Sequence, residues 1–192
     1  MKRTLLNLSA LLAAASLMML SAPMALAQTS TNTQSNVGLG IKGLGASLGF
    51  VDPEGGSSTL SLGLHVDAGT LVQNLHVVPY FQYWSVGATV GAYETDRSDV
   101  AFAMDLNYDF PIQGSRVTPY LGSGLGLHFL SADATAPGAT SSSDTKLGID
   151  LQGGIRSPMM PNFSLYAQTR YAFISDAGQF SIEGGFTYLF VY

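Results

Sequence analysis

The chain has no cysteine, so it can form neither a disulfide framework nor a thiolate metal site or nucleophile. It is also poor in charge, because charged residues make up 11% of its 192 residues, against roughly 25% in a typical soluble domain. After residue 36 no apolar stretch approaches the roughly 18 residues that a membrane-spanning helix needs. These shortages argue against a water-soluble globule, a disulfide-rich scaffold and a bundle of membrane helices.

Glycine and aromatic residues are abundant instead, with 22 Gly, 10 Phe and 9 Tyr. Many of them fall in stretches where large apolar residues alternate with small or polar ones, which is the two-residue period of a β-strand. The clearest stretch is VAFAMDLNYDF, residues 100–110. Similar stretches lie at 61–68, 146–156, 163–173 and 179–192, and less regular ones at 37–50, 75–84 and 117–130. The sequence therefore predicts eight strands, most of about 10–14 residues.

The N-terminus has the composition of a secretory signal peptide. Residues 1–27 start with Lys2 and Arg3, continue as an apolar run and end in the small-residue motif Ala-Leu-Ala, after which we expect cleavage. A membrane anchor is the alternative, but no stop-transfer pattern follows. Cleavage removes two of the 8 basic residues and none of the 13 acidic ones, so the mature net charge is −7, which does not suit nucleic-acid binding. We predict a flexible polar lead-in at 28–36 and a single domain at 37–192.

The breaks between the predicted strands alternate in character. We expect polar loops at 51–58, 87–98, 131–144 and 175–179, and tight turns at 69–74, 111–116 and 157–161. This describes an up-and-down meander with both ends of the domain on the turn side. A strand at membrane depth cannot leave its amides without partners, so the last strand must pair with the first. The predicted fold is an all-β, eight-stranded antiparallel up-and-down transmembrane β-barrel, whose strands of about 10 residues span an apolar band of about 25 Å.

The chain ends in GGFTYLFVY, in which aromatic residues occupy every second position: Phe186, Tyr188, Phe190 and Tyr192. On a closing strand they form a lipid-facing row, with the last ring at the membrane–water boundary. Such a strand resembles the assembly signal of bacterial outer-membrane proteins. The stretch TPYLGSGLGLHF, residues 118–129, is similar to a PY-x-G-x-G-x-G pattern of small barrels. Residues 37–192 as a whole resemble the family of small porin-like barrels typified by the OmpA transmembrane domain and OmpX.

The resemblance implies a protein of the bacterial outer membrane, exported by a cleaved signal peptide and recognised by the barrel-assembly machinery through its C-terminal strand. Its other partners would be outer-membrane lipid and lipopolysaccharide, and we expect a monomer. The implied function is structural or porin-like, with a narrow polar lumen largely plugged by side chains. Two alternatives stay open: a surface adhesion barrel that acts through its extracellular loops, and a lipid-modifying outer-membrane enzyme.

Glycine motifs in two of the predicted strands have structural explanations. GLGIKG at 38–43 matches the G-x-G-x-x-G of dinucleotide sites, but a strand-like stretch follows it instead of the required helix. The strand face that carries Tyr120 and His128 also carries three glycines, which we expect to make room for aromatic rings in a narrow interior: Gly122, Gly124 and Gly126.

The three histidines do not form a recognisable site. His65, His76 and His128 lie on three different predicted strands and lack the spacing of a metal-ligand set. Lipid A deacylase-type barrels use a His and a Ser close together on one strand near the outer rim, whereas His128 and Ser131 do not share a strand face. We therefore predict no enzyme, no catalytic residue, no metal and no cofactor.

Charged residues on the polar strand faces are expected in the lumen: Lys42, Asp67, Asp105, Asp109, Lys146, Asp150, Arg156, Arg170 and Glu183. Counting outward from the expected hairpin centres places them in two rows, Lys42–Asp67–His76 near the turns and Asp150–Arg170–Glu183 nearer mid-height. Either these charges merely satisfy one another, or they form a gate whose opening admits a narrow water path. Eight further acidic residues, Asp99 among them, are assigned to the loops, where they suit a solvated rim.

Overall fold

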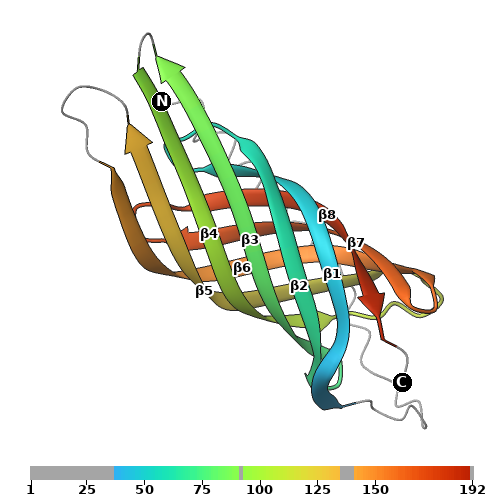
Figure 1. The fold of residues 1–192 in the computed structure, drawn as a ribbon. Helices are drawn as coiled ribbons and strands as arrows, with labels where there is room; N and C mark the ends of the chain where they lie inside the picture. Colours follow the sequence, from blue (N-terminus) through green and yellow to red (C-terminus); the bar gives the residue numbers. More distant parts are fainter. Residues whose placement is uncertain (1–36, 91–92, 135–140, 191–192) are drawn as a thin grey trace, which may run out of the picture. The chain divides into compact units, whose positions relative to one another are not determined.

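The computed structural model describes residues 37–90, 93–134 and 141–190, which form a closed barrel of eight strands (Figure 1). The strands are β1 (Gly38–Pro53), β2 (Thr59–Val72), β3 (Leu75–Val90), β4 (Tyr93–Asp109), β5 (Thr118–Ala134), β6 (Ser142–Met160), β7 (Phe163–Ile174) and β8 (Gln179–Leu189). Each strand pairs antiparallel with the next, and β1 closes the sheet against β8 from Gly43↔Leu189 to Pro53↔Gln179. The predicted up-and-down barrel is confirmed. The predicted signal peptide, the lead-in and Tyr192 lie outside the described residues.

Alternation along each strand separates an apolar outer face from a polar interior. In β1 the exposed side chains are Leu44, Leu48 and Phe50, while Gly45 and Ser47 between them are buried. The same pattern recurs around the wall, so the exposed apolar side chains form a continuous band. A protein in water would bury these side chains, whereas a barrel in a bilayer presents them to lipid. No helix in the described ranges is long and apolar enough to cross a membrane.

Aromatic rings pair on the outer face near the end of the barrel that carries the β2–β3, β4–β5 and β6–β7 connections, which we call the turn end. Tyr108 packs against Phe110 with ring centroids 5.0 Å apart, and Tyr188 packs against Phe190 at 5.8 Å. Phe163 stacks on Phe186 at 5.5 Å. Rings at this position are typical of the aromatic girdle at a membrane interface.

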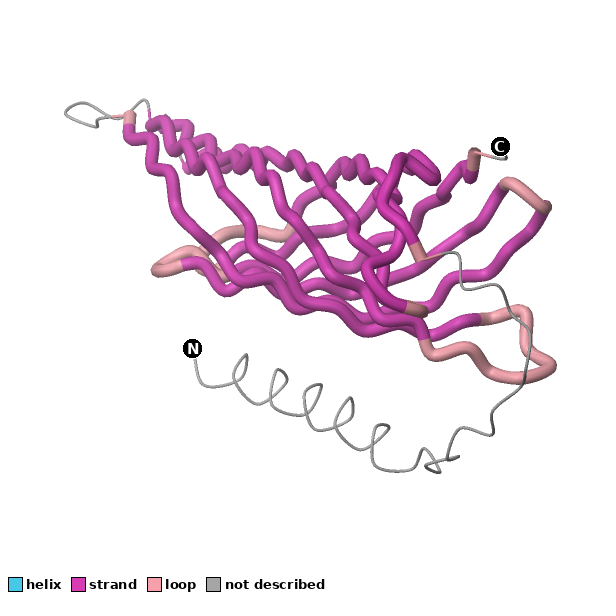
Figure 2. Tube along the Cα trace, turned by 90° about the horizontal axis from the view of Figure 1, so that it is seen from below, coloured by secondary structure: helices cyan, strands magenta, loops and turns pink. Residues whose placement is uncertain are grey.

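At the opposite end, which we call the loop end, the barrel rim is uneven. The predicted loops at 87–98 and 131–144 are wrong in extent: β3 and β4 stay paired up to Val90↔Tyr93, and β5 and β6 up to Ala132↔Ser142. By contrast, β1 and β2 end their ladder at Val51↔Thr59. The strands β3 to β6 therefore extend beyond the others at this end (Figures 1 and 2). Gly, Ser and Asp suggested loops here, but the backbone ladder continues above the apolar band.

Glycines on the inner face make room for side chains in the lumen, but at Gly122 and Gly124 these are polar side chains and not the expected aromatic rings. A Cβ on Gly122 or Gly124 would collide with Asn107 or Asp105 rather than with an aromatic ring. Tyrosines face other glycines: a Cβ on Gly63 would lie 2.8 Å from the Tyr80 hydroxyl, and one on Gly154 2.8 Å from the Tyr120 hydroxyl. The interior of an eight-stranded barrel is only just wide enough for side chains, so these glycines allow Tyr, Asp and Asn to share it.

Candidate functional site

The centre of the lumen is crossed by a buried arginine. Arg170 on β7 places Nη2 2.6 Å from Asp105 Oδ2 on β4 and Nη1 3.2 Å from Asp150 Oδ2 on β6. Its guanidinium also lies over the ring of Tyr80 on β3, 4.0 Å from the centroid. A charge-assisted contact to two carboxylates fixes the planar guanidinium in one orientation. Arg170 thus links β7 to β3, β4 and β6, and only 5% of its surface is exposed.

The predicted pairing of Arg170 with Glu183 is wrong. Opposite Glu183 stands Gln168, and opposite Arg170 stands Ser181, so the β7–β8 hairpin pairs two residues away from the expected register. Asp150 is likewise opposite Ala172 and reaches Arg170 diagonally. The physical reason is the turn, because its geometry fixes the register of every residue in a hairpin.

Glu183 is instead held by uncharged donors. Its carboxylate accepts hydrogen bonds from the Tyr80 hydroxyl at 2.7 Å, Ser47 Oγ at 3.0 Å and Ser181 Oγ at 3.2 Å. The side-chain amides of Gln82 and Gln168 donate to it at 3.2 and 3.4 Å. A carboxylate surrounded in this way is well hydrogen-bonded, and within the part of the chain that the structure describes it forms no ion pair with a Lys, Arg or His side chain.

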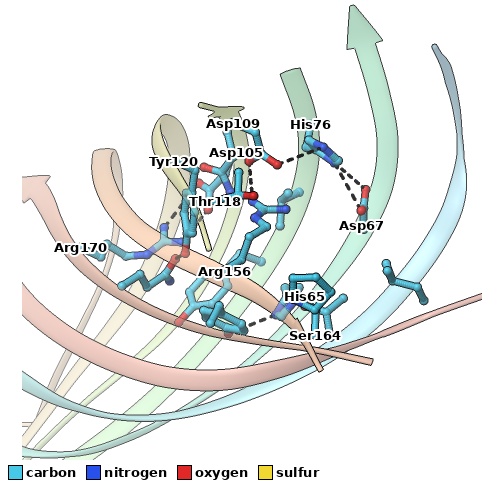
Figure 3. Close-up of a pocket in the computed structure, with 18 residues that line it drawn as sticks. His65, Asp67, His76, Asp105, Asp109, Thr118, Tyr120, Arg156, Ser164 and Arg170 are labelled. Atoms are coloured by element: carbon cyan, nitrogen blue, oxygen red, sulfur yellow. Dashed lines mark hydrogen bonds and ion pairs between the residues drawn. The ribbon is translucent and has the colours of Figure 1, made fainter. Parts of the chain in front are cut away.

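Near the turn end, four charged or titratable side chains form a band across the mouth of the lumen (Figure 3). His76 Nδ1 lies 3.3 Å from Asp67 Oδ2, its Nε2 lies 3.7 Å from Asp109 Oδ2, and Arg156 Nη2 lies 3.2 Å from Asp109 Oδ1. The structure thus brings Asp67 and His76 together as the sequence suggested, and it adds Asp109 and Arg156. Arg156 also lies over the Tyr120 ring, 4.6 Å from its centroid.

Lys42 does not belong to this band. The register places Gly43 opposite Asp67, and an irregularity in the ladder separates Gly43 from Leu39. Lys42 is exposed and falls on the same alternation as Leu44. A slip of one residue moves a side chain to the other face of a sheet, which is why the predicted pair Lys42–Asp67 fails.

Towards the loop end, a second buried layer contains His128 on β5 and Asp99 on β4. His128 Nδ1 lies 2.8 Å from Asp99 Oδ2, and Gln179 Nε2 donates to the same oxygen at 3.0 Å. Trp84 Nε1 in turn donates to Gln179 at 2.8 Å. The sequence predicts that Asp99 lies in a loop, which is wrong, because the extension of β4 buries it in the lumen. Asp99 falls on the same two-residue alternation as the buried Ala101, Ala103 and Asp105, and this pattern could have predicted that it faces the lumen.

Two cavities lie on either side of these buried layers and share no lining residue. The inner cavity, at the turn end, has a volume of about 260 Å³ and is lined by residues that include His65, Asp105, Tyr120, Arg156, Tyr166 and Arg170. The outer cavity, at the loop end, has about 140 Å³ and is lined by residues that include Glu54, Trp84, Arg97, Asp144, Lys146 and Asp176. A space of either size holds several water molecules.

The three histidines enter three separate networks. His65 contacts Thr187 and Tyr166, His76 contacts two carboxylates, and His128 contacts Asp99 and Gln179. In the ranges that the structure describes, no group of three or more His, Asp or Glu side chains is arranged to hold a metal ion. The partners of His128 Nδ1 are Asp99 and Gln179, and Ser131 is not among them.

An apolar outer band, a closed antiparallel wall and a polar interior define an integral outer-membrane β-barrel protein. Residues 12–190 match the family described as "Outer membrane protein beta-barrel domain", and the chain belongs to that family. No curated protein is similar enough in sequence to give a match.

Solved structures show the same fold at low sequence identity. Neisserial surface protein A (NspA) is 21% identical, with a TM-score of 0.62 over 77% of this chain and 95% of its own. Ail, the attachment invasion locus protein of Yersinia pestis, in complex with the heparin analogue sucrose octasulfate, is 16% identical, with a TM-score of 0.52 over 78% and 97%. The N-terminal barrel of Pseudomonas aeruginosa OprF is 11% identical, with a TM-score of 0.51 over 79% and 99%.

Proposed function

We propose that this protein is a structural or porin-like barrel whose lumen is closed at mid-height by side chains. One observation carries the proposal: Arg170 bridges Asp105 and Asp150 across the lumen between two cavities that share no lining residue. A guanidinium held by two carboxylates, one of them at 2.6 Å, leaves no continuous water column at that level. The resting barrel then passes ions weakly or only in brief openings.

The proposed orientation follows from the predicted signal peptide and from the alternation of connections. An exported chain that inserts from the periplasm places its termini and the turn end there, and its loop end at the cell surface. The inner cavity then opens to the periplasm. Outer-membrane lipid and lipopolysaccharide surround the apolar band, and the aromatic row Phe186, Tyr188 and Phe190 on the closing strand is the segment offered to the barrel-assembly machinery. The barrel acts as a monomer.

Planar-bilayer conductance of the refolded protein tests this function. Wild type is expected to show a conductance far below that of an open pore, and Arg170→Ala is expected to raise it and to favour cations, because two carboxylates then line a widened path. Lys146→Ala is the matched control, because Lys146 also carries a positive charge towards the lumen but donates to the Ser175 carbonyl near the outer mouth. Equal conductance in wild type and Arg170→Ala would place the closure elsewhere.

Surface adhesion is the second candidate, and the uneven rim favours it. The strands β3 to β6 stand above the rest and offer a rigid surface to a partner. Ail is known in complex with a heparin analogue, sucrose octasulfate, which is a polyanion. The loop end here is acidic, with Asp52, Glu54, Asp133, Asp144 and Asp176 against Arg97 and Lys146, so a polyanion would be repelled. Adherence of expressing cells, lost when residues 87–96 are replaced by a two-residue turn while the barrel still folds, would support this role over the porin-like one.

A further inference from the structure

The buried carboxylates of the lumen outnumber the cations beside them. Four carboxylates lie at its centre, with 0–2% of their surface exposed: Asp99, Asp105, Asp150 and Glu183. We call these four residues, together with His128 and Arg170, the central carboxylate cluster. Arg170 is the one permanent cation within it. If every carboxylate were ionised and His128 neutral, the cluster would carry a net charge of −3.

Other cations of the described lumen are already engaged elsewhere. Arg156 pairs with Asp109 in the inner cavity, Lys146 donates to the Ser175 carbonyl, and Arg97 donates to the Gly55 carbonyl. None of these contacts neutralises Asp99, Asp150 or Glu183. An uncompensated charge in a buried site is costly, and such a site usually acquires a counter-charge or loses its own.

Several buried polar atoms in the cluster have no hydrogen-bond partner within the described ranges, and they indicate where a proton could bind. Two carboxylate oxygens of the cluster, Asp99 Oδ1 and Asp150 Oδ1, have no hydrogen-bond partner among the described residues, and the same holds for Gln152 Oε1 two residues from Asp150 on β6. Two nitrogens of the cluster, His128 Nε2 and Arg170 Nε, also have none. His128 Nε2 and Asp150 Oδ2 each lie 3.1 Å from the position that a Cβ would occupy on Gly126. Oxygen acceptors without donors, beside a ring nitrogen that either donates or accepts, form a site that added hydrogens would complete.

We propose that the central carboxylate cluster is a proton-binding site, in which the folded barrel holds at least one proton more than the same side chains hold in the unfolded chain at neutral pH. The proton comes from solvent and is shared among Asp99, His128 and Asp150. Bound there, it turns an unpaired acceptor into a donor and lowers the net negative charge by one. The proposal concerns the folded protein as such and holds whether or not the barrel conducts ions.

The neighbours of the cluster come from six strands. Tyr80 faces it from β3, Asp99 and Asp105 from β4, His128 from β5, Asp150 from β6, Arg170 from β7 and Glu183 from β8. The contacts from β1 and β2 in this region are uncharged, with Ser47 donating to Glu183 and Gly63 facing Tyr80. Further titratable groups line the inner cavity, among them His65, Tyr166 and Tyr120, and the Tyr120 hydroxyl donates to the Gln168 side chain that donates to Glu183. Because ionisable groups from several strands face one another here, the bound proton is counted for the cluster as a whole and not for one residue.

Protons can reach the site from the turn end without unfolding the barrel, because Asp105 and Arg170 line the inner cavity directly. On the other side Trp84 lines the outer cavity and donates to Gln179, which donates to Asp99, so these two uncharged side chains separate the outer cavity from the cluster. Raising the pH would withdraw the proton, increase repulsion among the carboxylates and draw water or cations into the centre of the lumen.

Proton uptake during refolding tests the proposal. Urea-unfolded protein is diluted into detergent micelles at pH 7.5 in a weakly buffered solution, with an indicator dye reporting the protons taken up per chain. Wild type is expected to take up about one proton more than Asp150→Asn, because the variant has one carboxylate fewer to neutralise. Glu183→Gln is the second variant, used if Asp150→Asn does not fold. Asp144→Asn is the matched control, since Asp144 is exposed at the loop end and should leave the uptake unchanged.

Isotope-edited infrared spectra give an independent readout. The folded wild type at neutral pH should show the C=O band of a protonated carboxyl group, which the variant should lack or show more weakly. Equal uptake in wild type and in both folded cluster variants, without that band, would overturn the proposal. Stability that rises with Na⁺ or K⁺ at constant pH, without proton uptake, would also overturn it, because the counter-charge would then be a metal cation.

Discussion

Replacing Arg170 by alanine tests the energetics of the lumen most directly. The change removes the contacts at 2.6 Å to Asp105 and 3.2 Å to Asp150, and it uncovers the Tyr80 ring that the guanidinium overlies at 4.0 Å. Breaking a buried ion pair by removing one partner typically costs about 3–5 kcal/mol, because a buried charge is left without compensation. Here two carboxylates lose the same partner, and water drawn from the inner cavity lowers the cost. We expect Arg170→Ala to reduce the free energy of unfolding by about 3 kcal/mol.

Urea unfolding in detergent micelles measures this change, with the fluorescence of Trp84 as the probe. Trp84 is the single tryptophan, and it is buried in the lumen against Gln179. A double-mutant cycle with Asp105→Asn separates the ion pair from lost packing. The coupling free energy between the two sites is expected to be about 1–3 kcal/mol, with the double variant more stable than Arg170→Ala alone. A loss below about 1 kcal/mol in Arg170→Ala, with no coupling, would show that the pair contributes little and would refute the reasoning.

The remaining predictions concern location, assembly and packing. Fractionation should place the mature protein in the outer membrane with a heat-modifiable mobility on gels, and recovery as a soluble periplasmic protein would contradict the assignment. Deleting residues 190–192, or changing Tyr192→Ser, should reduce membrane insertion in cells, whereas normal assembly of both variants would leave the aromatic row a role in lipid packing alone. Gly63→Ala should destabilise the barrel by about 1–3 kcal/mol, because the added Cβ would lie 2.8 Å from the Tyr80 hydroxyl, while Gly38→Ala, with open space around it, should be neutral in the same urea assay.

The sequence specified the strands and their faces well. Alternation in a stretch such as 100–110 is a local property, and it separates Phe102 and Met104 outside from Asp105 and Asn107 inside without any knowledge of the neighbouring strands. Closure also followed from physics, since an open edge at membrane depth has no partner for its amides. The alternation along the last strand also predicted correctly that Phe186, Tyr188 and Phe190 lie on the outer face.

Register within hairpins was predictable only approximately. The β7–β8 hairpin differs by two residues from the expected pairing, which keeps every side chain on its face and changes only its partner. The irregularity in β1 is more serious, because one residue of slip moves Lys42 to the outer face and away from Asp67. Asp99 was predicted to lie in a loop because residues 87–98 are polar. In the structure β3 and β4 remain paired through this stretch.

Contacts across the lumen cannot be predicted by counting residues outward from the hairpin turns. Arg170 on β7 bonds most closely to Asp105 on β4, and no hairpin joins these two strands. They meet because the sheet closes into a narrow cylinder, and their relative height depends on the stagger accumulated around the whole wall. Period-two alternation therefore identifies which charges face inward, while closure and stagger decide which carboxylate neutralises which cation. The excess of carboxylates over cations in the lumen is already visible in the sequence. Only the closed barrel shows how the cations are distributed: Asp150 shares Arg170 with Asp105, while among the described residues neither Asp99 nor Glu183 pairs with a Lys or Arg side chain.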